Sequence, residues 1–399
     1  PETSVAGFIQ LPGSGRQVYN FNPGWRFFKG DIHGAESVDF DDRSWTIVST
    51  PHTVELMPAE ASGCRNYQGP AWYRKHFVLP AETKGKRVLI HFEAAMGKQV
   101  LYLNGKRIQE HVGGYLPFTL DLTTNGIQAG DSCLLAIFVD NSNDKSFPPG
   151  KPQYTLDFAY HGGIYRDVWM IAKSPVSITD PLDSQTVAGG GVFVHFDKIS
   201  EKSAQVYVNT ELQNDNQHTE TVTVETTLTD ADGKVIKRTS GKLSLKSGEK
   251  KIIRQQIEVK SPKLWSPDAP YLYKVQSRIK KGNQSIDGGI TRIGIRLAEF
   301  RGKDGFWLNG KPFVQLVGAN RHQDFAYVGN ALPNSQQWRD AKRLRDAGCT
   351  IIRVAHYPQD PSFMDACDEL GMFVIVATPG WQYWNKDVKF GELVHQNTR

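Results

Sequence analysis

Cysteines and long apolar runs are both scarce in this sequence. The four cysteines lie far apart and form no Cys-x-x-Cys pair, which argues against a zinc site and a small disulfide framework. They are Cys64, Cys133, Cys349 and Cys367. No run approaches the roughly 18 consecutive apolar residues of a membrane-spanning helix. The net charge is only +5, and no lysine or arginine cluster is long enough for nucleic-acid binding. We therefore expect neither a membrane span nor a nucleic-acid partner.

The length and composition are those of an ordinary globular protein with two or three domains. The 399 residues are 39% hydrophobic and 22% charged, and each domain is large enough to bury its own core. Nine tryptophans suit carbohydrate recognition and large β cores alike. The chain opens on Pro1 without an initiator Met, as after a removed signal peptide or at a fragment boundary. The compartment stays open, with a periplasmic or secreted location favoured over a cytoplasmic one.

Residues 1–177 are predicted to fold as an all-β domain. Strand-length runs rich in β-branched and aromatic residues are separated by Gly, Pro, Asn and Asp clusters, and these runs lie at 87–92, 99–103, 134–139 and 167–171. Asn104-Gly105 is a strong hairpin signal, because both turn positions require a positive φ. The economical interpretation is a sandwich of two packed sheets, specifically a jelly roll.

A second β pattern occupies residues 178–298, after a predicted linker at 175–181. Its strands alternate strictly, and two faces are expected to be buried: one of Val206, Val208, Thr210 and Leu212, the other of Val222, Val224, Thr226 and Leu228. Asp232-Gly233 marks another hairpin turn. Roughly 115 residues with a turn every dozen or so fit an immunoglobulin-like sandwich, and the missing Cys…Trp…Cys pattern excludes an antibody-type domain.

Residues 299–399 are predicted to begin a (β/α)8 barrel after a hairpin at 306–313. Apolar runs alternate with helical patterns, as in βα units on a parallel sheet; the runs lie at 313–320, 350–355 and 372–377 and the helices at 335–347 and 361–370. A closed barrel needs eight strands, so these three make an incomplete one.

Local signals agree with the two predicted helices. Gly348 and Gly371 stand where each helix is expected to stop. Asp360-Pro361 supplies an N-cap followed by proline at the first helical position. The first helix is predicted to bury one stripe, made of Trp338, Ala341, Leu344 and Ala347.

Polar and aromatic side chains follow each predicted barrel strand. The first strand leads into Asn320-Arg-His322, the second into Arg353-Val-Ala-His-Tyr357, and the third into Thr378-Pro-Gly-Trp381. The carboxyl ends of parallel strands meet at one rim, where ligands bind in barrels and α/β sheets. Any one of these residues could equally well cap a helix or fill a loop. Because such residues follow three strands in succession, the pattern favours the interpretation that they form the wall of a binding site.

Five motifs lie in the same order as the three predicted domains. They are Gly113-Gly-Tyr-Leu-Pro-Phe118, Gly162-Gly-Ile-Tyr-Arg166, Leu264-Trp-Ser-Pro-Asp-Ala-Pro-Tyr-Leu-Tyr273, Gly318-Ala-Asn-Arg-His322 and Ile352-Arg-Val-Ala-His-Tyr-Pro358. Together they resemble glycoside hydrolase family 2, which contains β-galactosidases, β-glucuronidases and β-mannosidases. The resemblance covers essentially the whole chain.

Membership would imply a retaining β-glycosidase that uses two glutamates, one as nucleophile and one as acid/base. In the family these follow the fourth and seventh barrel strands, so both would lie beyond Arg399. We therefore expect the 399 residues by themselves to be inactive and assign no catalytic residue among them. Asp324, Asp360 and Glu369 are interpreted as loop, N-cap and helix-surface residues.

The resemblance also implies a non-covalent sugar site. Asp157 resembles the sandwich-domain aspartate that binds a sugar hydroxyl, because it stands six residues before Gly163, although a turn aspartate is the alternative. A carboxylate accepts strong hydrogen bonds from vicinal hydroxyls. His322 and His356 look like the family histidines around the cleaved bond, where an imidazole donates to a sugar hydroxyl.

Other members of the expected site have supporting roles. Arg353 resembles an arginine that orients the nucleophile and holds it ionised, and Asn320 is expected to fix the first loop. Trp381, with Trp384 as an alternative, would form an apolar platform for a sugar face or else a core contact.

One departure from the family concerns metals and the substrate. Many members have Asp-Glu at the end of the third strand, where this chain has Val376-Ala377. In the metal-dependent galactosidases that glutamate ligates magnesium, and Ala377 cannot ligate anything. We therefore predict no metal here and no cofactor, and the case for a lactose-cleaving enzyme of the best-known type is weaker.

Two classes of function remain compatible with these residues. The first is the amino-terminal part of a retaining β-glycosidase, with β-galactosides as the expected substrates and β-glucuronides or β-mannosides as alternatives. The second is a non-catalytic carbohydrate-binding protein. It is physically awkward, because a three-strand partial barrel exposes strand edges and apolar helix surface, unless a homo-oligomer covers them. A carbohydrate is the expected partner in both.

Overall fold

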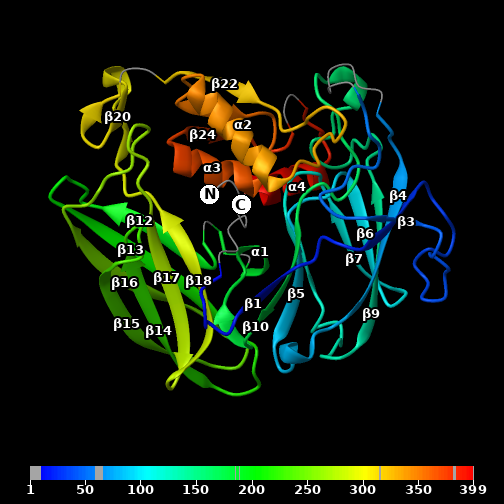
Figure 1. The fold of residues 1–399 in the computed structure, drawn as a ribbon, viewed down its shortest axis with the longest axis horizontal. Helices are drawn as coiled ribbons and strands as arrows, with labels where there is room; N and C mark the ends of the chain where they lie inside the picture. The colour runs from blue at the N-terminus through cyan, green and yellow to red at the C-terminus, as the bar shows by residue number, and fades with distance from the viewer. Residues whose placement is uncertain are drawn as a thin grey trace.

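The computed structural model describes residues 10–58, 66–184, 186–187, 189–313, 316–380 and 383–398. Two β-sandwiches stand side by side, and a smaller unit of strands and helices lies across them (Figure 1). The predicted fold class is confirmed: jelly-roll sandwich, immunoglobulin-like sandwich and the start of a barrel. None of the described helices is both long and apolar enough to span a bilayer.

The first sandwich packs a four-stranded sheet, in the order β1-β10-β5-β8, on a six-stranded sheet, in the order β3-β2-β4-β9-β6-β7. Its strands are β1 (Gln17–Asn20), β2 (Trp25–Lys29), β3 (Thr46–Val48), β4 (Pro70–Val78), β5 (Arg87–Phe92), β6 (Lys98–Leu103), β7 (Lys106–Val112), β8 (Phe118–Asp121), β9 (Ser132–Asp140) and β10 (Val168–Lys173), with short 3-10 turns at Ala81–Thr83 and Gln153–Thr155. Alternation decides the faces: Val88, Ile90 and Phe92 of β5 enter the core between the sheets, while Leu89 and His91 point to the other side. Asn104 and Gly105 adopt the positive φ that the β6–β7 turn requires.

The second sandwich packs a sheet built around β13 on the sheet β15-β14-β17-β18. Its elements are β11 (Val176–Ile178), α1 (Pro181–Ser184), β12 (Val192–Asp197), β13 (Ser203–Asn214), β14 (Glu220–Thr229), β15 (Val235–Leu245), β16 (Lys250–Lys260), β17 (Tyr273–Lys281) and β18 (Gln284–Ile293). Both predicted faces, on β13 and β14, are buried. The linker predicted at 175–181 is wrong for residues 176–178, which form strand β11. This strand pairs with β13, and its Val176 and Ile178 pack into the core of the second sandwich.

The third unit holds a hairpin and a parallel sheet. The hairpin strands are β19 (Ala298–Phe300), β20 (Phe306–Leu308) and β21 (Lys311–Pro312), with a 3-10 turn at Gly302–Asp304, and the parallel strands are β22 (Gly318–Arg321), β23 (Ile351–Val354) and β24 (Phe373–Val376). The helices are α2 (Asn334–Asp346), α3 (Pro361–Leu370) and α4 (Val388–Thr398). Ile352 and Val354 face α2 and α3 in a common core, which leaves the other face of the sheet to Asn320, Arg353 and Ile375.

Three local predictions for this unit need correction, while its caps are confirmed. Asp360 caps α3 ahead of Pro361, and Gly371 ends it in a left-handed conformation. The first strand, predicted from Phe313, begins only at Gly318, and Val314 and Gln315 lie outside the described residues. Ala347 is exposed, because α2 ends before it.

The third correction concerns Glu369, which is not a plain helix-surface residue. It accepts hydrogen bonds from Arg292 of β18 and from the Trp338 indole, and Arg292 also lies 2.8 Å from Asp365. Close by, the Trp265 indole donates to the Asp368 carbonyl of α3. The contacts of Arg292 and Trp265 hold helix α3 of the third unit on the second sandwich.

We predict that Arg292→Leu lowers the free energy of unfolding by about 2 kcal/mol, because two partly buried carboxylates lose their cation. Urea unfolding measures the change. Arg301→Leu is the control, because its ion pair with Glu299 is more exposed and should be worth less than about 0.5 kcal/mol. Equal effects of the two substitutions would contradict a stabilising role for the contacts of Arg292.

Candidate active site

Two histidines meet where β22 and β23 end. The strands run parallel with Arg321 opposite Val354, so His322 and His356 emerge at the same edge of the sheet. Their ring centroids are 5.3 Å apart and the rings are nearly perpendicular. The Ala355–His356 peptide bond is cis. Two sequence-predicted residues from different strands are thus brought into contact.

The first sandwich contributes a loop to the same place. Phe158 is buried, and its ring centroid lies 4.9 Å from that of His322 and 5.8 Å from that of His356. Its neighbour Asp157 is exposed, and its negative charge raises the pKa of both histidines. Because Asp157 directly precedes Phe158, whose ring contacts both histidines, it lies beside this cluster.

Burial keeps the two imidazoles neutral. Desolvation lowers the pKa of His322 below 6.5; Asp324 and Asp157 oppose this, and Arg321 and Arg353 add to it. Desolvation also lowers the pKa of His356, which is 7% exposed, and the neighbouring His322, Arg353 and Lys151 lower it further, against Asp157. At neutral pH both rings can therefore donate one hydrogen bond and accept another.

Tyr357 sets the orientation of His322. The Gln323 amide donates to the Tyr357 hydroxyl, and that hydroxyl lies 3.4 Å from His322 Nδ1. Burial raises the pKa of Tyr357, so the phenol keeps its proton and can donate to Nδ1. A phenol that donates to Nδ1 leaves the proton of the neutral imidazole on Nε2.

Asp324, interpreted from the sequence as a loop residue, is a carboxylate beside the histidine cluster. Burial favours its protonated form, but His161 and the charge of His322 outweigh this and lower the pKa of Asp324. Its Oδ2 lies 3.8 Å from His161 Nε2. The His161 ring, which pairs with Asp324, also packs against Gly329. A Cβ at position 329 would come within 2.5 Å of this ring, so only glycine fits there. A conventional loop aspartate gave no signal of this in the sequence.

The remaining predicted residues differ in how the structure places them. Arg353 is half-buried on β23, in register with exposed Asn320 on β22, and its charge acts on both histidines. Trp381 lies outside the described residues, and Trp384 is exposed. The functional roles assigned to Asp157, Asn320, His322, Arg353 and His356 stay predictions. No group of three or more His, Cys, Asp or Glu suited to a metal ion occurs within the described ranges.

Arg166 ties this cluster to the first sandwich. It is 2% exposed and donates to the Tyr115 carbonyl at 3.2 Å, to Gln323 Oε1 at 3.1 Å and to the Pro358 carbonyl at 2.7 Å. Gln323 follows His322 directly, and Pro358 stands two residues after His356. The ring of Tyr115 stacks on Tyr357 at 4.0 Å. One guanidinium therefore sets both histidine-bearing turns against the loop that carries Asp157.

The chain matches three models of a single family. They are described as "Glycosyl hydrolases family 2, sugar binding domain" over residues 35–175, "Glycosyl hydrolases family 2" over 190–296 and "Glycosyl hydrolases family 2, TIM barrel domain" over 300–395. The resemblance found in the sequence motifs is confirmed.

Its relatives carry two different names. A β-galactosidase of Thermoanaerobacter pseudethanolicus is 36% identical over 375 residues, covering 92% of this chain and 47% of the relative. A β-glucuronidase of Formosa agariphila is 33% identical over 381 residues, covering 92% and 38%. The solved structure of a Bacteroides uniformis β-glucuronidase has a TM-score of 0.85 at 30% identity, covering 96% and 44%. The chain thus spans about half, or less, of the length of these relatives.

We predict that Arg166→Met lowers the free energy of unfolding by about 3 kcal/mol, because three buried acceptors lose a charged donor. Denaturant titration measures the change. Arg107→Met, which removes an exposed partner of Glu110 on β7, should cost less than about 0.5 kcal/mol. A loss for Arg166→Met as small as this would show that the tie is unimportant.

The placement of Asp157 is testable by histidine titration. Asp157→Asn should lower the pKa of both His322 and His356, because the carboxylate favours their charged forms, whereas Asp232→Asn in a distant turn should change neither. NMR titration of the ring signals measures this, and unchanged values would place Asp157 elsewhere.

Since the pKa values of His322 and His356 are both below 6.5 in the folded protein, the unfolded chain binds more protons just under pH 6.5. The contribution of the two rings to stability is therefore complete above that pH and declines as the pH falls.

Proposed function

Because this chain belongs to family 2 of the glycosyl hydrolases, we propose that it forms the amino-terminal part of a retaining β-glycosidase. The proposed reaction is the hydrolysis of terminal β-linked sugars, with β-galactosides as the first candidates. The observation that carries the proposal is the meeting of His322, His356 and the charge of Asp157 at the carboxyl ends of β22 and β23.

The cluster has the chemistry of a sugar subsite. Asp157 is acceptor-only and suits two vicinal hydroxyls. The neutral rings of His322 and His356 would donate to sugar oxygens, and those bonds would strengthen as negative charge develops on an oxygen in the transition state. Phe158 holds both rings by contact, so the donors are fixed before a substrate arrives.

The bond-breaking step needs two carboxyl groups about 5 to 5.5 Å apart in a retaining enzyme. We assign neither to a described residue and propose that both come from barrel strands other than β22, β23 and β24. Arg353, half-buried on the open face of this sheet, would pair with the nucleophile and keep it ionised.

A β-glucuronide is the second candidate substrate, and a specific observation favours it. The positive charges of Arg353 and Lys151 both act on His356, against the negative charge of Asp157, so two cations lie around the cluster. A uronic acid carries a carboxylate that such cations would bind, whereas galactose does not. Similarity to proteins named β-glucuronidase is as strong as to those named β-galactosidase.

Hydrolysis assays on the protein encoded by the complete reading frame separate these sugars. The substrates are aryl β-galactoside, aryl β-glucuronide and aryl β-mannoside, compared by kcat/KM. Cleavage of one of them with retention of configuration is the expected result. A well-folded protein that cleaves none of the three would overturn the proposal.

In that protein we predict that Asp157→Ala and His356→Ala each lower kcat/KM by about 10- to 100-fold, because each removes a hydrogen bond between the substrate and a charged or transition-state-polarised group. Asp232→Ala, in the exposed β14–β15 turn, should leave it unchanged. Activity of both site variants within a factor of two of the parent would remove them from the subsite.

A further inference from the structure

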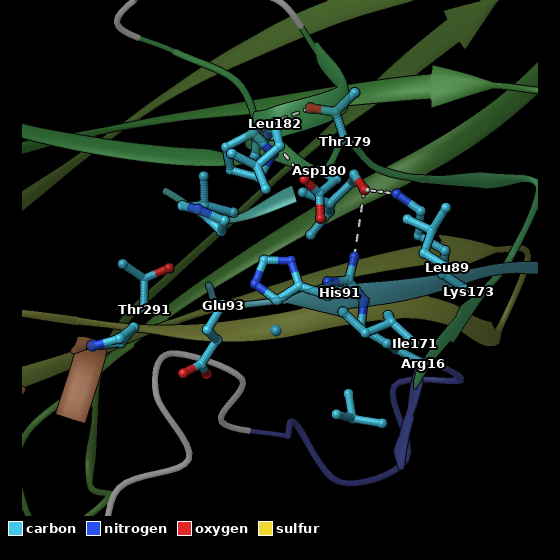
Figure 2. A pocket seen from close by; sticks show the side chains of 18 of the residues that line it. Arg16, Leu89, His91, Glu93, Ile171, Lys173, Thr179, Asp180, Leu182 and Thr291 are labelled. Carbon is cyan, nitrogen blue, oxygen red and sulfur yellow. Dashed lines mark hydrogen bonds between the residues drawn. The ribbon is translucent and has the colours of Figure 1, made fainter. Parts of the chain in front are cut away.

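A pocket of about 490 Å³ lies where the three units meet. Its lining includes β5 and β10 of the first sandwich, β18 of the second, and the turn at 358–361 that precedes α3. Figure 2 shows the side chains around it, with His91 and Glu93 side by side at the end of β5. The pocket is distinct from the histidine cluster, because none of Asp157, His322 and His356 lines it.

One wall is the outer face of the small sheet of the first sandwich. Val18, Ile171 and Leu89 stand opposite one another on the adjacent strands β1, β10 and β5. The outer face of a sandwich sheet ordinarily meets water and is polar, yet Leu89 and Ile171 are almost completely buried. Neighbouring parts of the chain therefore already exclude most of the water from this row, and an apolar occupant would complete its cover.

The facing wall has few side chains to fill the gap, because two of its four residues are glycines. It is formed by Gly288, Gly289, Ile290 and Thr291 of β18. Gly289 has no positive φ, and a Cβ built on it would meet no atom of the described residues within 4 Å. A larger residue would therefore fit the backbone and the space, so the glycine leaves room that the fold does not require.

The two polar ends of the pocket differ in whether their side chains already have hydrogen-bond partners among the described residues. Arg16 and Lys173 both donate to the Ile178 carbonyl, and Arg16 is also paired with Asp287. At the other end Glu93 Oε1 accepts from the Trp169 indole at 2.9 Å. Glu93 Oε2 has no hydrogen-bond partner among the residues that the structure describes, although Glu93 is only 2% exposed.

The charge state of Glu93 narrows the chemistry of an occupant. Burial and the nearby carboxylates of Asp360 and Asp167 raise the pKa of Glu93 well above its usual value, and desolvation lowers the pKa of His91 to about 4. At neutral pH this end therefore presents an uncharged acid and an uncharged imidazole, beside the guanidinium of Arg166, which also lines the pocket. A hydroxyl group can both accept from and donate to such a carboxylic acid.

We propose that the pocket binds a small uncharged molecule with a hydroxyl group on a compact apolar frame, its hydroxyl paired with Glu93 Oε2 and its frame between Leu89, Ile171 and Gly289. The volume lies within the 300 to 1,000 Å³ of small-molecule sites. Water is a poor substitute along the apolar walls, because an ordered water needs two to four polar partners. This site is independent of the proposed glycosidase activity.

The test uses the 399-residue chain with benzyl alcohol and toluene, two probes of similar shape that differ in the hydroxyl. Calorimetric titration should show benzyl alcohol binding about threefold to tenfold more tightly than toluene, the range expected for one net hydrogen bond. Glu93→Met should abolish this preference while toluene still binds. Glu93→Gln keeps a hydrogen-bonding amide at the position and should retain the preference.

Filling the pocket provides the complementary test. Gly289→Leu should weaken both probes at least tenfold, whereas Gln284→Leu, at an exposed position of the same strand, should leave both unchanged. If Gly289→Leu unfolds, Thr291→Leu serves in its place. A crystal structure of the complex should show benzyl alcohol beside Glu93. No binding, equal binding to the filled variants, or density for water or protein in this space would each overturn the proposal.

Discussion

The buried guanidinium of Arg166 is the interaction on which the candidate site depends. It donates to carbonyl or amide oxygens in three separate segments, so it satisfies acceptors that would otherwise be buried without partners. Two of those segments carry His322 and His356, and the third carries Tyr115, which stacks on Tyr357. A site assembled from two folding units is precise only if such a bond fixes the units relative to each other.

Burial has opposite consequences for the groups around this tie. It keeps His322 and His356 neutral and therefore able to exchange hydrogen bonds with a neutral ligand. Glu93, Asp167 and Asp360 lie near one another where the units meet, and burial raises the pKa of each of these carboxyls. The same dehydrated junction that holds the histidines in place thus creates an uncharged polar end in the neighbouring pocket.

Sequence reasoning succeeded where the controlling interactions are local or periodic. Strands such as β5, the buried faces of β13 and β14, the Asp360 cap and the Gly371 stop follow from side-chain alternation and backbone geometry. It failed where a distant partner decided the outcome. Glu369 joins two units because Arg292 of the second sandwich donates a hydrogen bond to it. Residues 175–181 contain a strand because the edge of β13 pairs with them.

The sequence by itself determined the order of the three units, the family and the strand ends that carry His322 and His356, because these depend on patterns and motifs along the chain. Only the tertiary structure decided that Phe158 and Asp157 meet those histidines, that Asp324 pairs with His161 and acts by its charge on His322, and that an apolar row on β5 and β10 faces a glycine of β18. Such contacts join residues more than a hundred positions apart, and no local spacing encodes the docking of one folded unit on another.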